Sequence, residues 1–394
     1  MADPLVESYL LLGLRLGRHV DGLVDAYYGP PELKKRVDAE PIIEPAALVE
    51  QGDALLEGLE DSWLRDQARG LRMYAGVLAG EELSYSDEVE GCYGVRPERT
   101  STDVYEAAHG RLQELLPGPG PLADRYRVWR EQNLVPADVV VPALVDVAAE
   151  LRAIVSRLVE LPDGEGFDAV VVHDEPWGAF NYYRGGLRSR IVVNLDDPWT
   201  FHELYHLTCH EIYPGHHTER AVKERLLVDE QGQLEETILL VPTPGALLAE
   251  GIAEAGPLVI WDRDPGLADR VAAIARRHGV EYDVEQAQAV ARTRLVLRRA
   301  AVDAALMIHE DAASVAEAAA YRQRWGLFTA EQAEHSIKFL VDPIWRAYAI
   351  TYSAGRELCG AWMNGDAARL RRLLTEHVRV GELASGSGSA DDQS

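Results

Sequence analysis

The sequence predicts a mainly α-helical protein with a small antiparallel β-sheet, folded in two lobes around a cleft. Apolar residues recur at helical spacing through most of the chain. β-branched runs that suit strands are concentrated between Asp168 and Asp197. The chain has 394 residues, 47% of them hydrophobic, which is enough to bury one large core or two lobes. A folded enzyme is therefore the first expectation.

Residues 1–165 have the pattern of a helical bundle, which we expect to roof the cleft. The run Pro117 to Pro121 is the most obvious hinge or connection within it. No fixed-period repeat is visible, so a solenoid is not expected. The apolar positions at helical spacing are Val6, Leu10 and Leu14; Leu55, Leu56 and Leu59; Leu71, Tyr74 and Leu78; and Val140, Leu144, Val147 and Leu151.

Two or three antiparallel strands are expected next. Residues 169–172 and 191–193 are β-branched runs, and glycines at 178, 185 and 186 lie between them. An edge strand beside a cleft can pair with an extended peptide through main-chain hydrogen bonds. Strands that only brace the helices would have the same pattern, so both interpretations stay open.

The helix that follows carries most of the chemistry. Asp197 as N-cap and Pro198 at the first helical position predict a helix through His202, His206 and His210. Pro214 should stop or kink it, because proline clashes with the carbonyl four residues earlier. A second helical piece is expected from about residue 218.

The C-terminal half is predicted to be helical. A helix over 246–254 places Glu250 and Glu254 one turn apart on one face, which is unusual on an otherwise apolar helix. Further helices are expected over 285–309, 312–324, 330–363 with a break at Asp342-Pro343, and 366–378. Residues 385–394, SGSGSADDQS, are expected to be a disordered tail. Residues 1–384 are expected to form one intertwined domain. It has an N-terminal helical part over 1–165 and a part over 166–384 that carries the candidate metal site.

Composition narrows the partners and the compartment. The formal charge of −26 makes nucleic acids and anionic membrane surfaces poor partners. Cys92, Cys209 and Cys359 are widely spaced, which argues against a disulfide framework or a thiolate zinc site and favours a reducing, cytoplasmic location. The N-terminal residues resemble neither a signal peptide nor a membrane span. The oligomeric state is not indicated.

Two metal-binding patterns overlap between residues 202 and 216. His202-Glu-Leu-Tyr-His206 is a literal HExxH, which places both imidazoles on one face of a regular helix. His210-Glu-Ile-Tyr-Pro-Gly-His216 separates its histidines by six positions, so they converge only if Pro-Gly redirects the chain.

A family resemblance favours the second pattern. HEIYPGHH at 210–217 and AEGIAEAG at 249–256 resemble the HExxPGHH and EGWAxYxE signatures of a bacterial family of unknown function, numbered 885. Segments GLRLGRHVDGLVDAYYGPPEL, RRAAVDAALMIH and AYAITYSAGR also look like blocks of this family. The family is grouped with the zincin metallopeptidases, of the gluzincin-like kind, and is similar in fold to the Taq-type carboxypeptidases. In the second signature, Ile252, Ala255 and Pro257 depart from the family pattern.

The resemblance implies a zinc site with His210, His216 and Glu250 as ligands and Glu211 as general base. Two histidines and one glutamate leave a fourth position for water, whose pKa zinc lowers toward ~7. Under this hypothesis His202 and His206 make hydrogen bonds inside the cleft rather than bind metal.

Four further residues are candidates for substrate chemistry. Tyr352 is the first choice to donate a hydrogen bond to an oxyanion, and His309 is the second. Arg346 and Arg356 could clamp the carboxylate of a carboxypeptidase substrate. The alternatives are a core aromatic for Tyr352 and surface cations for the arginines.

The leading hypothesis is a zinc-dependent hydrolase of small peptide or amide substrates, of carboxypeptidase-like character. An iron or di-iron oxidase is the main alternative, since Glu203 with His206 and Glu106 with His109 both form ExxH pairs. A non-catalytic binding protein is less favoured, because the candidate base and ligands are all present. Recruitment of the zincin scaffold to non-peptide metabolism also stays open.

Overall fold

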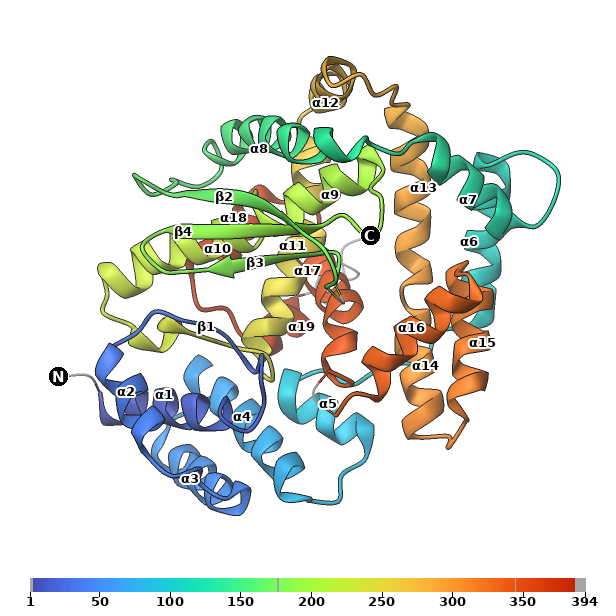
Figure 1. Ribbon diagram of the computed structural model, residues 1–394. Helices are drawn as coiled ribbons and strands as arrows, with labels where there is room; N and C mark the ends of the chain where they lie inside the picture. The colour runs from blue at the N-terminus through green and yellow to red at the C-terminus, as the bar shows by residue number, and fades with distance from the viewer. Residues whose placement is uncertain (1–2, 176, 344, 387–394) are drawn as a thin grey trace.

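The computed structural model describes residues 3–175, 177–343 and 345–386, and these form a mainly helical protein with two small sheets (Figure 1). The predicted fold class is thus confirmed. The helices are α1 (Pro4–Leu16), α2 (Pro31–Ala39), α3 (Pro45–Gly58), α4 (Trp63–Ala79), α5 (Tyr85–Tyr93), α6 (Thr102–Leu115), α7 (Leu122–Gln132), α8 (Val140–Val155), α9 (Phe201–Glu211), α10 (His216–Lys223), α11 (Pro244–Arg263), α12 (Leu267–Arg277), α13 (Val284–Leu297), α14 (Ala300–His309), α15 (Val315–Gly326), α16 (Ala330–Val341), α17 (Arg356–Met363), α18 (Ala367–Thr375) and α19 (Val380–Gly386). The strands are β1 (Val24–Tyr27), β2 (Gly166–Val172), β3 (Ala179–Tyr183), β4 (Arg188–Asn194) and β5 (Ile238–Leu240).

The larger sheet has the order β2-β4-β3. Strands β3 and β4 are antiparallel, as predicted, and so is the separate pair β1 and β5. Strand β2, however, runs parallel to β4, which corrects the expectation of purely antiparallel strands in this region. The reason is that β4 inserts between β2 and β3, so the chain reverses after β2 but skips one strand position.

Several helix boundaries differ from the prediction. Helix α9 begins at Phe201, not at Pro198, because Thr200 and Glu203 form a capping box that satisfies the first backbone N–H groups. The expected helix over 285–309 is divided into α13 and α14. The break at Asp342-Pro343 is confirmed, since α16 ends at Val341.

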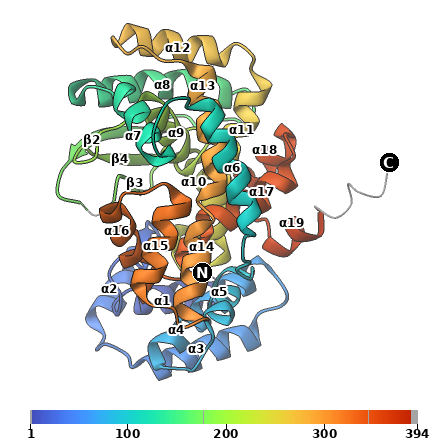
Figure 2. The same cartoon turned by 90° about the vertical axis from the view of Figure 1, so that its right-hand side faces the viewer.

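Four hydrophobic clusters form the core of the described residues, and the smallest is the group of Ala26, Tyr183 and Ala221. The largest draws residues from both 1–165 and 166–384 and surrounds α8, α9, α11 and α17. A second lies among α1–α4 and β5, and a third between α6–α7 and α13–α15. Figure 2 shows α8 and α12 at one end of the molecule and α1–α4 at the other, with α10, α11 and α17 between them.

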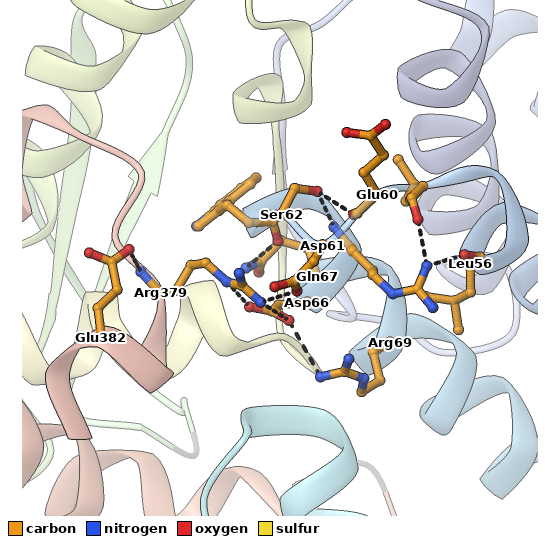
Figure 3. Close-up of polar contacts among 12 residues, drawn as sticks. Leu56, Glu60, Asp61, Ser62, Asp66, Gln67, Arg69, Arg379 and Glu382 are labelled. Carbon is orange, nitrogen blue, oxygen red and sulfur yellow. Dashed lines mark hydrogen bonds and ion pairs between the residues drawn. The ribbon is translucent and has the colours of Figure 1, made fainter. Parts of the chain in front are cut away.

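The C-terminal segment is tied to the N-terminal helices by Arg379 (Figure 3). Its guanidinium donates hydrogen bonds to Asp61 at 2.6 Å and to Asp66 at 2.7 and 3.1 Å. Its backbone N–H donates to Glu382. Ser385 and Gly386 end α19, so these two do not belong to the tail predicted over 385–394, and 387–394 lie outside the described residues.

Candidate metal centre

Helices α9, α10 and α11 bring His210, His216 and Glu250 together. Within the described ranges this is the one group of three or more such side chains whose ligand atoms all lie close together, within 4.8 Å of one another. Glu250 Oε2 lies 3.4 Å from His210 Nε2, and its Oε1 lies 3.4 Å from His216 Nε2. These are the three residues that the family resemblance implies as ligands.

The chain between the two histidines leaves helical geometry, as their spacing requires. Helix α9 ends at Glu211, and Ile212 has φ −123° and ψ −79°. At Gly215 a Cβ would lie 1.7 Å from the carbonyl oxygen of His210, so only glycine fits where the chain turns back. The N–H of Gly215 donates to the carbonyl of Cys209 at 2.9 Å. Pro214 and Gly215 therefore redirect His216 toward His210.

Helix α11 presents Glu250 through close backbone packing. A Cβ at Gly251 would lie 2.5 Å from the carbonyl oxygen of Gly355 and from Cys359 Sγ. Gly355 ends the π-helical turn η5 (Thr351–Gly355), which carries Tyr352. The glycine that follows Glu250 thus lets this turn approach helix α11 closely.

The chemistry of the group fits a divalent cation. Two imidazoles and one carboxylate are a common zinc donor set. Glu250 Oε2 is buried and accepts no hydrogen bond in the structure, a costly arrangement unless a cation is bound there. Burial alone would raise the pKa of Glu250, but His216, His210 and the Tyr348 hydroxyl lower it below its ordinary value. Glu250 is therefore held as a carboxylate, the form that binds metal.

Glu254 is a functional candidate whose role the sequence reasoning missed. Its Oε1 lies 3.4 Å from His210 Nδ1 and accepts a hydrogen bond from Arg298 at 2.7 Å, while its Oε2 lies 3.3 Å from His206 Nε2. Burial opposes the charge on Glu254, but Arg298, His206 and His210 lower its pKa well below the ordinary value. A carboxylate behind a metal-binding histidine fixes the orientation of the ring. The one-turn spacing from Glu250 was the available signal.

Tyr348 is a second candidate that was missed. Its hydroxyl donates to Glu250 Oε1 at 2.7 Å and so fixes the orientation of this carboxylate. It lies on a short 3₁₀ turn, η4 (Tyr348–Ile350), directly before η5. No sequence pattern near it indicated this contact.

Burial and the charge of neighbouring carboxylates act against each other at His210. Burial lowers the pKa of this imidazole, but Glu254, Glu250 and Glu211 together raise it to about 9. Three carboxylates thus favour positive charge at this position, which is the charge that a bound cation would supply.

The literal HExxH pattern does not converge on a metal position. His202 Nδ1 is hydrogen-bonded to the Tyr282 hydroxyl at 2.7 Å, and burial, with a smaller contribution from His206, lowers its pKa to about 3. His206 contacts Glu254 instead. These are hydrogen-bonding roles inside the fold, in line with the hypothesis for both residues.

The ExxH pairs of the iron hypothesis do not assemble either. Glu203 accepts hydrogen bonds from Arg130 at 2.9 and 3.0 Å. Glu106 is exposed, and His109 is bonded to the carbonyl of Trp325 at 3.1 Å. Nothing in this arrangement favours the oxidase alternative.

A cavity of about 970 Å³ opens beside His210, His216 and Glu250. The three ligand residues, Glu211 and Tyr352 line it. The Tyr352 ring stacks near His210 with a centroid distance of 6.5 Å. N-terminal residues, including Tyr9 and Tyr28, line another part of it, as expected if residues 1–165 cover the cleft.

His309, Arg346 and Arg356 are not among the described residues that line the cavity. His309 is hydrogen-bonded to the carbonyl of Leu340 at 2.8 Å. Arg346 donates to the buried carboxylate of Glu88, with contacts of 3.3 and 2.5 Å. Arg356 lies 3.6 Å from Glu357. The structure therefore does not bring these three residues to the cavity beside Tyr352, and the oxyanion role of His309 and the carboxylate clamp stay predictions.

The three cysteines are free and buried. None of the helices in the described part of the chain is both long and apolar enough to cross a membrane.

The fold resembles that of solved bacterial proteins. One, from Colwellia psychrerythraea and provisionally described as a lipoprotein, has a TM-score of 0.52 and 15% identity over 90% of this chain and 64% of that one. Another, from Shewanella oneidensis and provisionally described as a lipoprotein of unknown function, has a TM-score of 0.49 and 13% identity over 90% of this chain and 75% of that one. The chain thus spans about 64% of the Colwellia protein's length, and at 15% identity the likeness concerns the fold alone. No family model and no curated protein matches the chain.

Proposed function

We propose that the protein is a zinc-dependent hydrolase of peptide or related amide bonds. The observation that carries the proposal is the convergence of His210, His216 and Glu250 at the wall of a large cavity, with Glu211 beside them. When bound, zinc would supply a Lewis acid that polarises an amide carbonyl and makes water a better nucleophile near neutral pH.

The chain's own residues supply the proton transfers in this proposal. Glu211 follows the ligand His210 and lines the cavity, so its carboxylate can take a proton from attacking water and pass it to the leaving amine nitrogen. Tyr352 also lines the cavity, and burial together with nearby Glu250 raises its pKa well above the ordinary value. A neutral phenol donates a hydrogen bond, so Tyr352 suits the developing oxyanion.

The proposal includes membership of the zincin-like family numbered 885, which rests on the motif HEIYPGHH. It also includes a cytoplasmic location, which three free, buried cysteines favour. It does not extend to carboxypeptidase specificity, because Arg346 and Arg356 are not among the described residues that line the cavity.

The test compares Glu211→Gln with the wild type after loading with zinc. We expect the variant to retain one zinc per chain by elemental analysis and to lose at least ~100-fold in kcat on a panel of short peptides, the usual scale of general-base catalysis. Glu203→Gln is the matched control, since Glu203 lies on the same helix and pairs with Arg130. Equal turnover by Glu211→Gln and wild type would exclude the proposed base.

A further inference from the structure

We propose that the cavity selects peptides with a bulky aromatic side chain beside the scissile amide, and that it disfavours acidic side chains there. The cleavage step rests on the function proposed above. The binding preference rests on the shape and charge of the cavity, and can be tested without cleavage.

One wall of the cavity is a continuous series of aromatic rings that ends at a metal ligand. Phe339 stacks on Trp345 with a centroid distance of 5.9 Å, and Trp345 meets Tyr348 edge-on at 5.6 Å. Tyr348 meets Tyr352 edge-on at 5.6 Å, and Tyr352 stacks near His210. All five residues line the cavity. A ligand that reaches the metal cluster along this wall therefore meets ring faces and edges throughout.

A second aromatic group lies at strand β3 and the loop before it. Phe180 and Tyr182 are two residues apart on the strand, so their side chains share one face, and their rings are 4.7 Å apart. The ring centroids of Trp177 and Phe180 are 6.0 Å apart. These three residues also line the cavity.

Partial exposure distinguishes these rings from core aromatics. Tyr182 is 42% exposed, and Trp177, Phe180, Phe339 and Trp345 are all half-buried. In the third core cluster, by contrast, Tyr105 and Trp325 are stacked and almost fully buried. Half-buried rings around a cavity leave apolar surface to be covered by a ligand, and aromatic ligands gain ring contacts beyond simple area burial.

The buried charges of the cavity argue against acidic ligands, and the one further lysine or arginine among its described lining residues, Lys338, is exposed. The two buried cations of the cavity are already paired: Arg220 with Asp25 at 2.7 Å, and Lys223 with Glu219 at 2.7 Å. Asp25 Oδ1 and Glu219 Oε2 are buried and accept no hydrogen bond. An acidic side chain entering this space would therefore meet carboxylates without gaining a free buried cation.

The experiment uses the full-length, zinc-loaded Glu211→Gln protein and four free peptides of equal length: Ala-Phe-Phe-Ala, Ala-Leu-Leu-Ala, Ala-Ala-Ala-Ala and Ala-Glu-Glu-Ala. Calorimetry should give a dissociation constant for the phenylalanine peptide about tenfold lower than for the leucine peptide, the scale of one or two aromatic contacts. The glutamate peptide should bind most weakly. Equal affinity for all four would overturn the inference.

Two variants locate the preference and a third serves as control. Trp345→Leu and Phe180→Leu should each reduce the phenylalanine preference to about threefold or less. Trp325→Leu removes a ring from the aromatic cluster outside the cavity and should leave the preference unchanged. A preference that survives in both Trp345→Leu and Phe180→Leu would show that it arises elsewhere, against the inference.

Wild-type hydrolysis of the same peptides separates the two proposals. Aromatic preference in binding without cleavage of any peptide would refute the proposed hydrolase and leave the inference standing. Cleavage of all four peptides at similar kcat/KM would support the hydrolase and overturn the inference.

Discussion

His217 Nε2 lies 2.8 Å from Glu165 Oε2, and both side chains are completely buried behind the turn that carries His216. The carboxylate can only accept, so Nε2 donates. The same carboxylate oxygen accepts a hydrogen bond from the Tyr213 hydroxyl at 2.7 Å, and His217 Nδ1 lies 2.9 Å from Ser189 Oγ on β4. Tyr213 and His217, on the two sides of the Pro-Gly turn, are thus bonded to one carboxylate, that of Glu165 directly before β2.

Glu165→Gln should therefore weaken metal binding as well as stability. We expect a loss of about 3 kcal/mol in the free energy of unfolding, typical of a broken buried ion pair. Zinc affinity should fall about 10- to 100-fold, the usual cost of losing a group that supports a ligand. Urea unfolding and competition with a zinc chelator measure the two effects.

Asp303→Asn is the matched control for this variant. Asp303 is also a buried carboxylate that accepts hydrogen bonds from two tyrosines, Tyr105 and Tyr321, but it contacts no part of the metal cluster. It should lose stability and retain zinc affinity. A parallel loss of zinc affinity in both variants would mean that stability alone explains the Glu165 result.

Acid should remove the contribution of Glu165 in a defined pH range. Burial would raise the pKa of this carboxyl, but His217, Tyr213 and Arg152 lower it from 4.5 to about 2. Because the folded-state pKa is depressed, the stabilisation is present above pH 4.5 and is lost as pH falls toward 2. The difference in unfolding free energy between metal-free wild type and Glu165→Gln should shrink over this range. A constant difference from pH 5 to 3 would contradict this assignment.

Glu254→Gln tests the carboxylate behind His210. The substitution removes the charge that holds the His210 ring and leaves Arg298 without its buried partner. Zinc affinity should fall about 10- to 100-fold. The visible spectrum of cobalt-substituted protein should also change, since it reports ligand orientation. Glu357→Gln, which breaks the more exposed pair with Arg299, is the control and should alter neither quantity.

The structure brings together His210, His216 and Glu250, the three residues that the family resemblance singled out in the sequence. Pro214 and Gly215 interrupt a strongly patterned helix between two histidines. This indicates that the chain changes direction there and can bring the two imidazoles together. Glu250 could be paired with them only through its motif. Strand β4 and helix α11 have local patterns of their own, a β-branched run over 191–193 and a helical pattern over 246–254, so their existence was predictable too.

Contacts between distant segments could not be predicted in the same way. Arg346 and Glu88 are 258 positions apart, and neither has a local pattern that indicates a buried pair. An arginine near a site motif looks the same in sequence whether it faces substrate or a carboxylate of the core. The parallel pairing of β2 with β4 was missed for a similar reason, since strand order depends on tertiary packing.

Tyr352→Phe should separate the oxyanion role from a packing role. Loss of the hydroxyl should reduce kcat by about 100-fold, with little change in KM, if the hydrogen bond forms only in the transition state. His309→Phe should keep the stacking on Tyr85 but lose the bond to Leu340, so it should reduce stability and leave kcat within about twofold. Equal loss of kcat in both variants would contradict the assignment.

Arg379→Met should loosen the C-terminal segment without affecting the metal. Leu373, Glu376 and Val378 line one end of the cavity, and the Arg379 contacts with Asp61 and Asp66 hold that segment on the N-terminal helices. Loss of these charge-assisted hydrogen bonds should accelerate limited proteolysis after residue 375 severalfold, because local opening of the segment becomes easier.

The control for Arg379→Met is Arg371→Met, at an exposed position of α18. Zinc affinity should be unchanged in both variants, because the proposed ligands lie on α9, α10 and α11. Mass spectrometry of the proteolytic fragments identifies the site of cleavage. Equal rates of cleavage in Arg379→Met and Arg371→Met would contradict this prediction. They would show that the ion pairs of Figure 3 are not needed to hold the C-terminal segment on the N-terminal helices.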